Sequence, residues 1–564
     1  MARTVSIGAQ DFEELITKNN FYVDKTLFIK EWWESDDKVT LITRPRRFGK
    51  TLNMNMLERF FSVKFKDKGG IFENLNIWKE EKYRKLQGDW PVIFLSFAGI
   101  KETEYTLSVR RFCEILQGLY IKNYFLLNTN VLTEGEKKTF KKMADQMESA
   151  DAAMALHWLS DYLYRYYGKK VIIILDEYDT PLQEAYTGGY WEELVSFTRN
   201  LFNNTFKTNP YLERAVMTGI TRISKESMFS DINNLNIVTI TSDEYASCFG
   251  FTEEEVFSAM DEFELTNKEE VKKWYDGFRI GTWKDIYNPW SITCYLKEKK
   301  LKPFWANTSS NGLVNNLLRN GDIDLKMQFE ELLQRHPVIS EIDEEIVFER
   351  LGQNAEEVWS LLLAGGYLTT LNVSNDNYEL ALTNYEVEKM FRKMVKTWFR
   401  YDKAAYNRFI KALLTGNLKE MNAYMNRVSL AMFSFFDGGS RPSEFTMPER
   451  FYHGFVLGLL VELADRYDIT SNRESGLGRY DVMLRPLRQG DNGIILEFKV
   501  HEPKEESSME ETVLAALNQI EEKRYEQTLI NQGIEKNHIR KYGLAFKGKE
   551  VLIGSLLGSQ PIYH

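Results

Sequence analysis

Residues 38–58 read Lys-Val-Thr-Leu-Ile-Thr-Arg-Pro-Arg-Arg-Phe-Gly-Lys-Thr-Leu-Asn-Met-Asn-Met-Leu-Glu. The apolar run at residues 39–42 predicts a buried strand. Leu52, Met56 and Leu57 recur at helical spacing and predict a helix. Between them lies a loop that ends in Gly49-Lys50-Thr51. The stretch therefore predicts a strand, a loop and a helix in immediate succession.

This loop has the context of a phosphate-binding P-loop. The free amides and positive dipole end of the following helix suit a polyphosphate. Lys50 would reach the β- and γ-phosphates, and the Thr51 hydroxyl would hold Mg²⁺. Arg44 stands where the pattern G-x-x-x-x-G-K-[ST] has its first glycine, which adds positive charge. The residues predicted to bind ATP here are Arg44, Pro45, Arg46, Arg47, Phe48, Gly49, Lys50, Thr51 and Leu52.

A second motif makes a chance Gly-Lys-Thr less plausible. Five apolar residues at 171–175 predict a central parallel strand buried on both faces, and Asp176-Glu177 follow it directly. Asp176 would hold Mg²⁺, and Glu177 would polarise the attacking water. Ligands gather at the carboxyl ends of strands in open α/β sheets, which is where both motifs lie. The alternative is that the two acidic residues only cap a strand.

A third strand is predicted near residues 215–224 and ends in polar residues. Thr218 could contact the γ-phosphate or the attacking water, as a sensor does. Arg222 could neutralise charge in the transition state. A strand end with a solvated arginine is an equally good interpretation.

Five motifs together resemble the prokaryotic AAA-ATPase-like family. They are RPRRFGKT (44–51), ILDEYD (174–179), TGITRISKESMFSDINNL (218–235), WYDGF (274–278) and YNPWSI (287–292). The resemblance spans about residues 5–300 and implies ATP binding. In that family the arginine-rich loop without the first glycine is the usual form, and a nuclease-like domain usually follows at the C-terminus.

The C-terminal region carries a second candidate site on two predicted strands. Asp481 lies on a strand at residues 480–484, and Glu497 and Lys499 lie on a strand at residues 493–500. Glu497 and Lys499 share a face because side chains alternate along a strand. The two carboxylates would hold Mg²⁺ or Mn²⁺, and the lysine would orient or activate a water. A chance Glu-x-Lys on an amphipathic strand is the alternative.

These residues resemble the PD-(D/E)xK nuclease superfamily, with Tyr480 in place of the proline. A helix from residue 515 to Tyr525 is similar to the Gln…Tyr helix of that superfamily, and residues 543–546 predict a last strand. The resemblance adds His453, on a predicted core helix at residues 449–464, as a further metal ligand. A buried structural histidine is at least as good an interpretation.

Composition excludes some classes of protein. The net charge of −10 over 564 residues argues against a chain coated in basic charge, although a local basic groove stays open. Three widely spaced cysteines predict neither a disulfide framework nor a zinc site. The N-terminus lacks a signal peptide, and no run of about 18 apolar residues could span a bilayer. We therefore expect a cytoplasmic protein without a membrane partner.

The predicted fold is a multidomain α/β protein with four parts. They are a P-loop AAA-like ATPase domain (1–240), a helical lid (241–330), a helical, winged-helix-like connector (331–440) and a restriction-endonuclease-like domain (441–564). Thr252 and Glu255 form a capping box at the start of a lid helix. An Asn/Ser/Asp turn between residues 367–373 and 378–382 predicts a hairpin in the connector.

The leading hypothesis is an ATPase coupled to a metal-dependent nuclease that acts on nucleic acid, with DNA favoured over RNA. Defence or control of mobile elements is suggested by analogy alone. One alternative is a nucleotide-dependent switch whose nuclease fold is a non-catalytic binding module. Another is a metabolic NTPase without nucleic acid, which the net charge mildly favours. The oligomeric state, a homo-oligomer included, stays open.

Overall fold

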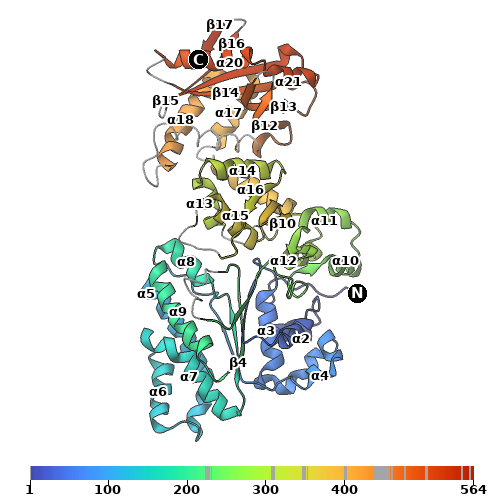
Figure 1. The fold of residues 1–564 in the computed structure, drawn as a ribbon. Coiled ribbons are helices and arrows are strands. Elements are labelled where there is room, and N and C mark those ends of the chain that lie inside the picture. Colours follow the sequence, from blue (N-terminus) through green and yellow to red (C-terminus); the bar gives the residue numbers. More distant parts are fainter. Residues whose placement is uncertain are drawn as a thin grey trace. The chain divides into compact units, whose positions relative to one another are not determined.

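The fold is taken from a computed structural model of the chain, shown in Figure 1. It describes residues 2–222, 229, 232–306, 311–345, 351, 354–398, 403–436, 458, 461–475, 478–501, 506–547, 550–557 and 560–563. Contacts between Cα atoms divide the chain into two compact units. The first unit comprises residues 1–314 and 337–388, and the second comprises residues 315–336 and 389–564.

A parallel sheet of five strands forms the centre of the first unit, in the order β2-β3-β4-β1-β5. The strands are β1 (Val39–Thr43), β2 (Val92–Ser96), β3 (Val171–Asp176), β4 (Leu212–Gly219) and β5 (Leu235–Val238). Every residue of β1 and β3 is buried, as their continuous apolar runs predict. β4, and not β3, takes the middle position, so the end of β4 lies between the P-loop and the Asp-Glu motif.

Helices cover both faces of this sheet, and Figure 1 shows α3 and α4 on one side and α5, α6, α7 and α9 on the other. The α-helices are α1 (Phe12–Thr17), α2 (Leu27–Glu34), α3 (Lys50–Phe61), α4 (Glu81–Arg84), α5 (Tyr105–Lys122), α6 (Glu134–Asp145), α7 (Ser149–Tyr167), α8 (Thr180–Gly188) and α9 (Trp191–Phe202). Segments of 3₁₀ helix are η1 (Val63–Phe72), η2 (Asn76–Lys79) and η3 (Tyr124–Asn128), and η4 (Asn203–Lys207) is a π-helical turn.

The segment after the sheet, which was predicted to be a lid and is called the lid below, combines helices with short strands. It contains α10 (Glu253–Glu262), α11 (Lys268–Tyr275) and α12 (Pro289–Glu298), together with β6 (Phe251–Thr252), β7 (Phe278–Ile280) and β8 (Trp283–Tyr287) in the order β6-β8-β7. The predicted capping box of Thr252 and Glu255 is confirmed. The small antiparallel sheet was not predicted from the sequence. Val5 and Phe21 of the N-terminal segment pack into the lid core, which ties the start of the chain to this segment.

Residues 337–388 form a helix-and-hairpin module. It contains β9 (Val338–Glu341), α15 (Ala355–Ala364), β10 (Leu368–Ser374) and β11 (Asn377–Leu382), with strand order β10-β11-β9. The first residues of α16 (Tyr385–Trp398) complete it. Asn375 and Asp376 connect β10 to β11 with φ angles of 48° and 66°. Positive φ at both central residues is typical of the tight turns that suit a hairpin, so the predicted hairpin is confirmed.

Glu386 of α16 provides a pH-dependent anchor between this module and the lid. One carboxylate oxygen accepts a hydrogen bond from Ser291 Oγ (2.8 Å), and the other accepts one from Trp305 N (2.6 Å). Burial raises the pKa of Glu386 from 4.5 to about 7, although these hydrogen bonds oppose the shift. The folded protein therefore holds more protons than the unfolded chain between these pH values, so its free energy of unfolding should fall as pH rises from about 4.5 to about 7.

We expect Glu386→Gln to remove that fall, because glutamine keeps an oxygen for the backbone amides and carries no charge. Urea unfolding at pH 5 and pH 8 would measure it for the wild type and the variant. Glu341→Gln, at an exposed position on β9, is the matched control. An unchanged pH dependence in Glu386→Gln would show that another group causes the effect.

The second unit is built on a six-stranded mixed sheet in chain order. Its strands are β12 (Tyr467–Ser475), β13 (Gly478–Pro486), β14 (Gly493–Val500), β15 (Ile539–Lys547), β16 (Glu550–Leu557) and β17 (Gln560–Tyr563). β14 and β15 are its parallel pair, and their crossover carries α20 (Met509–Glu522), α21 (Glu526–Asn531) and the turn η8 (Lys536–His538). The prediction that residues 543–546 make the last strand is wrong, because β16 and β17 extend the sheet beyond β15.

The other helices that the structure describes in this unit are α14 (Ile323–Leu333), α17 (Lys403–Thr415), α18 (Leu418–Phe436) and most of α13 (Gly312–Asn320) and α16. Asn422 and Asn426 of α18 each exchange two hydrogen bonds with the backbone of β16, at Ile553 and Val551. They satisfy backbone groups of β16 that lie before the stretch paired with β17 in the described residues. Most of the predicted helix at 449–464, with His453, lies outside the described residues. Within the described part of the chain, no helix has the length and apolar character needed to cross a bilayer.

Candidate nucleotide and nuclease sites

The P-loop connects β1 to α3 and ends at Gly49, whose backbone conformation favours glycine. Gly49 is the N-cap of α3 and has a φ of 83°, a conformation that costs a residue with a Cβ atom. Lys50 and Thr51 are the first two residues of the helix, where backbone amides lack intrahelical partners. Phe48 is buried and packs edge-on against Phe278 of the lid at 4.9 Å. The end of the loop is thus held by helix α3, which follows it, and by the contact of Phe48 with the lid.

Lys50 is a buried cation at this loop. Its Nζ donates to the carbonyl oxygens of Arg44 (3.0 Å) and Pro45 (2.9 Å). Burial lowers the pKa of Lys50, and the carboxylates of Glu177, Asp179 and Asp176 act against that shift. A phosphate oxygen would be a stronger acceptor for this ammonium than either carbonyl, because a bond between two charged groups is the stronger kind.

Three residues predicted from separate stretches of sequence meet at one carboxylate. Asp176 at the end of β3 accepts hydrogen bonds from Thr51 Oγ1 (2.8 Å) and Thr218 Oγ1 (2.7 Å). Burial raises the pKa of Asp176, while the two threonine hydroxyls oppose the rise. Hydroxyl and carboxylate oxygens are the hard ligands that Mg²⁺ prefers, so Thr51 and Asp176 fit this ion.

Glu177 and Asp179 follow Asp176 and have different environments. Glu177 has a φ of 56°, an uncommon value for a residue other than glycine, and its carboxylate accepts from Thr180 Oγ1 at 2.8 Å. Asp179 is fully buried and accepts from the amides of Ile220 and Thr221, both at 2.9 Å. Asp179 therefore ties the end of β3 to the end of β4. Sequence reasoning missed this role, although the residue stands in the quoted ILDEYD motif.

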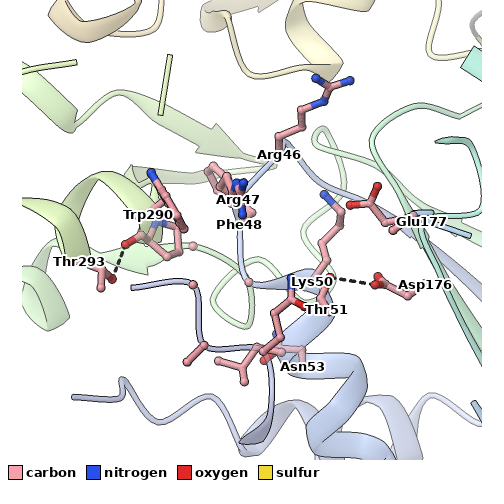
Figure 2. Close-up of a pocket in the computed structure, with 18 of the residues that line it drawn as sticks. Arg46, Arg47, Phe48, Lys50, Thr51, Asn53, Asp176, Glu177, Trp290 and Thr293 are labelled. Atoms are coloured by element: carbon pink, nitrogen blue, oxygen red, sulfur yellow. Dashed lines mark hydrogen bonds between the residues drawn. The ribbon is translucent and has the colours of Figure 1, made fainter. Parts of the chain in front are cut away.

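A pocket of about 540 Å³ opens beside these groups. Figure 2 shows Lys50, Thr51, Asp176 and Glu177 on one side of it and Arg47 and Trp290 on the other. The residues from 46 to 53 line it, and the N-terminal segment and the lid supply further walls: Ser6, Gly8, Ala9, Gln10, Tyr22, Val23, Lys25, Phe251, Pro289, Trp290 and Thr293. The sequence did not predict that these residues line the pocket. Only Pro289 and Trp290 belong to a motif noted in the sequence, YNPWSI.

Arg47 lies against an aromatic wall of the pocket. Its guanidinium carbon lies 4.3 Å from the centre of the Trp290 ring, within the range of a cation–π interaction. Arg46 donates to Gln183 Oε1 at 3.4 Å and also lines the pocket. The predicted extra positive charge of the loop thus faces the pocket through these two arginines.

Arg44 is placed differently from the prediction that it contacts the nucleotide. Its side chain is fully buried and donates to the carbonyl oxygens of Thr239 (2.7 Å), Glu244 (2.9 Å) and Thr43 (2.9 Å). Burial lowers the pKa of Arg44 to about 10. These carbonyl oxygens accept hydrogen bonds from most of the N–H groups of the guanidinium. Arg44 therefore connects the start of the loop to the segment after β5. Neither Arg44 nor Pro45 lines the pocket.

Arg222 also lies apart from the pocket walls. Its guanidinium forms a short ion pair with Glu345 and lies 3.8 Å from a carboxylate oxygen of Glu344. The sequence interpretation of a solvated arginine does not hold either, because 19% of this side chain is exposed. Thr218 is turned toward Asp176 and does not line the pocket.

In the second unit, Asp481 and Glu497 lie opposite each other where β13 and β14 separate. The antiparallel ladder ends at the pair Val482 and Leu496, one residue before them. Asp481 Oδ2 accepts from the amide of Phe498 at 2.7 Å, and Glu497 accepts from the amide of Asp481 at 3.4 Å. The diverging strands therefore bring two carboxylates together without a backbone pair between them.

Glu497 is the most perturbed group of this pair. Its side chain is nearly buried, and burial together with the charge of Asp481 raises its pKa from 4.5 to about 8. Gln519 of α20 forms a short hydrogen bond to Glu497 and contacts the Tyr525 hydroxyl at 3.2 Å. Lys499 follows two residues later on β14 and is half-buried. Two crowded carboxylates fit a divalent cation, which would remove the repulsion between them.

Comparisons with known proteins match the regions of the two candidate sites to two different families. Residues 6–229 match the model of the predicted AAA-ATPase family, and residues 447–555 match that of the PD-(D/E)XK nuclease superfamily. An uncharacterized protein from the vnfD 5′ region of Azotobacter chroococcum is 25% identical over 397 residues, or 68% of each chain. A STAND-class signal transduction ATPase with a tetratricopeptide repeat sensor, from Pyrococcus horikoshii, is a solved structure with 12% identity and a TM-score of 0.23. That alignment covers 79% of this chain and 56% of that one.

Strands β1 to β4, the P-loop and the Asp-Glu strand end lie within the first matched region, and the paired carboxylates lie within the second. The chain therefore joins an N-terminal region that matches the predicted AAA-ATPase family to a C-terminal region that matches the PD-(D/E)XK nuclease superfamily.

Proposed function

We propose that the protein binds and hydrolyses ATP and that this activity controls a metal-dependent nuclease that acts on DNA. The proposed ATPase activity rests on one observation. Thr51 and Thr218 donate hydrogen bonds to Asp176 beside the buried Lys50, next to a pocket of about 540 Å³. In this proposal Lys50 binds the terminal phosphates, and Thr51 and Asp176 hold Mg²⁺. Glu177 orients the attacking water from the pocket wall.

The base and sugar would occupy the other end of the pocket. There the walls come from the N-terminal segment and from Phe251 and Trp290 of the lid. Because Val5 and Phe21 pack into the lid core, the two walls would move as one. Nucleotide binding between them and the P-loop would therefore stabilise a closed arrangement of lid and sheet.

The second half of the proposal rests on the paired carboxylates of Asp481 and Glu497. They would hold Mg²⁺ or Mn²⁺, which would supply the charge that stabilises the leaving oxygen of a phosphodiester. Lys499 would orient or deprotonate the water, and Gln519 keeps Glu497 in position through its hydrogen bond. DNA is favoured over RNA, and a role in defence or in control of mobile elements is suggested by analogy alone.

Cleavage of circular and linear DNA with Mg²⁺ or Mn²⁺, with and without ATP, tests the whole proposal. We expect cutting that depends on the metal, is lost in Glu497→Ala, and changes in rate when ATP is added. Lys50→Ala should lose the response to ATP and keep the metal requirement. A Lys50→Ala protein with unchanged cleavage and unchanged ATP response would refute the coupling.

The second candidate function is a nucleotide-dependent switch. The burial and raised pKa of Glu497 favour it, because a carboxylate held protonated binds metal poorly. In that case the protein would bind ATP and cut no DNA or RNA at any concentration of Mn²⁺. The cleavage assay therefore separates the two functions.

A further inference from the structure

A further pocket, of about 430 Å³, lies within the second unit, and we call it the basic pocket. Arg335 and His336 follow the end of α14, Arg392 belongs to α16 and Arg485 belongs to β13. Asp468 of β12 is the acidic side chain among the described residues that line it. Three guanidinium groups and one carboxylate make this pocket electropositive, although the net charge of the chain is −10.

Arg485 lines the basic pocket with a guanidinium that its ion pair uses only in part. Its Nε and Nη2 atoms donate to Asp468 Oδ2 at 3.2 Å and 2.6 Å. Its Nη1 has no hydrogen-bond partner among the described residues, and 41% of the side chain is exposed. Because a guanidinium is planar, the bonds to Asp468 fix the direction of its remaining N–H groups. An anion can therefore bind Arg485 without breaking the ion pair.

Arg335 has a backbone conformation that favours glycine. Its φ is 66°, and the amide of the next residue, His336, donates to the carbonyl oxygen of Glu331 at 2.9 Å, which ends α14. Helices commonly end at a glycine in this conformation, because a Cβ atom there costs free energy. An uncommon backbone conformation of this kind is a reason to look for a function of the side chain. In this chain the side chain belongs to a residue that lines the basic pocket.

The rest of the basic pocket is mostly apolar. Its walls include Leu333, Ala464, Ile469, the buried Tyr467, and Leu487, whose exposed fraction is 54%. A volume of about 430 Å³ lies within the range of small-molecule sites, about 300 to 1,000 Å³. The basic pocket therefore has the size and the lining for a ligand with an anionic end and an apolar or flat part.

The basic pocket is separate from both proposed sites. None of its described lining residues lines the nucleotide pocket. Arg485 lies on the same strand as Asp481, about 13 Å further along at the rise of a β-strand. Because side chains alternate along a strand, the two residues project from the same face of the sheet. A small ligand in the basic pocket would not contact the paired carboxylates, whereas a strand of nucleic acid is long enough to reach both.

We propose that the basic pocket binds the phosphate group of a ligand about the size of one nucleotide. The forked N–H groups of Arg335, Arg392 and Arg485 match phosphate oxygens, and three cations suit a group with two negative charges better than a carboxylate. The apolar wall at Tyr467 and Leu487 contacts the rest of the ligand. The phosphate belongs either to a free mononucleotide or to a nucleotide within a single strand. This site goes beyond the proposed function, because it needs neither ATP at the P-loop nor a metal in the second unit.

Calorimetric titration of the full-length chain in EDTA, with thymidine monophosphate and separately with a short oligothymidylate, tests the basic pocket. We expect Arg485→Gln to weaken binding about tenfold or more, because it removes hydrogen bonds between charged groups. Arg488→Gln, at an exposed position outside the basic pocket, is the matched control. Weaker binding of the monophosphate would assign a free ligand to the site. Weaker binding of the oligonucleotide alone would assign a strand of nucleic acid.

Asp468→Asn separates an effect on binding from a loss of folding. It should tighten binding of the same probe about fivefold, because it removes a charge that repels phosphate and that pairs with Arg485. A misfolded variant would bind less tightly. Asp465→Asn, exposed and outside the basic pocket, is the control.

The same changes in affinity are expected in the background of Lys50→Ala, which separates this site from the nucleotide pocket. Unchanged affinity in Arg485→Gln, or weaker binding in Asp468→Asn than in Asp465→Asn, would overturn the inference. A wild-type protein that binds neither probe would overturn it as well, and would leave the proposed ATPase and nuclease to their own tests.

Discussion

Replacing Lys50 by alanine is expected to weaken ATP binding by about 100-fold, or about 3 kcal/mol. Lys50 is buried beside the pocket, and its ammonium now binds only two backbone carbonyls. In complex with ATP it would bind charged phosphate oxygens in surroundings that screen charge weakly. Alanine removes that partner and leaves the phosphates to the loop amides and to Arg46 and Arg47, which line the same pocket.

The effect on stability should be much smaller than the effect on binding. The carbonyl oxygens of Arg44 and Pro45 lose a donor in Lys50→Ala, but the adjoining pocket can admit water to them. Lys170→Ala, at an exposed position just before β3, is the matched control. Calorimetric titration with ATP and Mg²⁺ measures the change. Equal affinities in Lys50→Ala and the control would mean that ATP does not bind at this loop.

Replacing Glu497 by glutamine is expected to lower metal-dependent DNA cleavage by about 10³-fold or more, because a bound metal contributes several kcal/mol to transition-state stabilisation. Glutamine keeps the size of the side chain and an oxygen that can accept the hydrogen bond from Gln519. It removes the negative charge that a divalent cation requires. Initial rates of plasmid cleavage with Mn²⁺ measure the loss.

The same substitution should change the pH dependence of stability in metal-free protein. The pKa of Glu497 is raised from 4.5 to about 8, so the folded state binds more protons than the unfolded state between these values. The free energy of unfolding of the second unit should therefore fall as pH rises from about 4.5 to about 8. Glutamine cannot ionise, so Glu497→Gln should unfold at higher urea concentration than the wild type at pH 8 in the presence of EDTA.

Glu522→Gln is the control for both measurements, because Glu522 is exposed near the end of α20. It should cleave DNA and respond to pH as the wild type does. Full cleavage by Glu497→Gln would remove Glu497 from the proposed metal site. Wild-type cleavage that is lost only with Lys499→Ala would assign the chemistry to the lysine without the carboxylate pair.

Local signals in the sequence were enough for the buried strands β1 and β3, the P-loop and the two carboxylate motifs, but not for the small sheet of β6 to β8 or for β16 and β17. The apolar runs of β1 and β3 predicted buried strands because parallel strands are covered on both faces. Gly49 marked the left-handed start of α3, and alternation along β14 put Glu497 and Lys499 on one face. In each case the prediction depends on a single residue type or on a short periodicity of side chains along the chain.

The amino-acid sequence was thus sufficient to locate the buried strands β1 and β3 and to select the residues that could bind phosphate and metal. What those residues contact depends on the tertiary structure. Arg44 and Arg222 look alike in the sequence, yet one is buried against backbone carbonyls after β5 and the other is bound by glutamates from residues 344–345. The pocket walls likewise come from residues 6–25 and 250–293 as well as the P-loop. Such contacts join residues far apart in the chain, and no local pattern records the partner of a long, charged side chain.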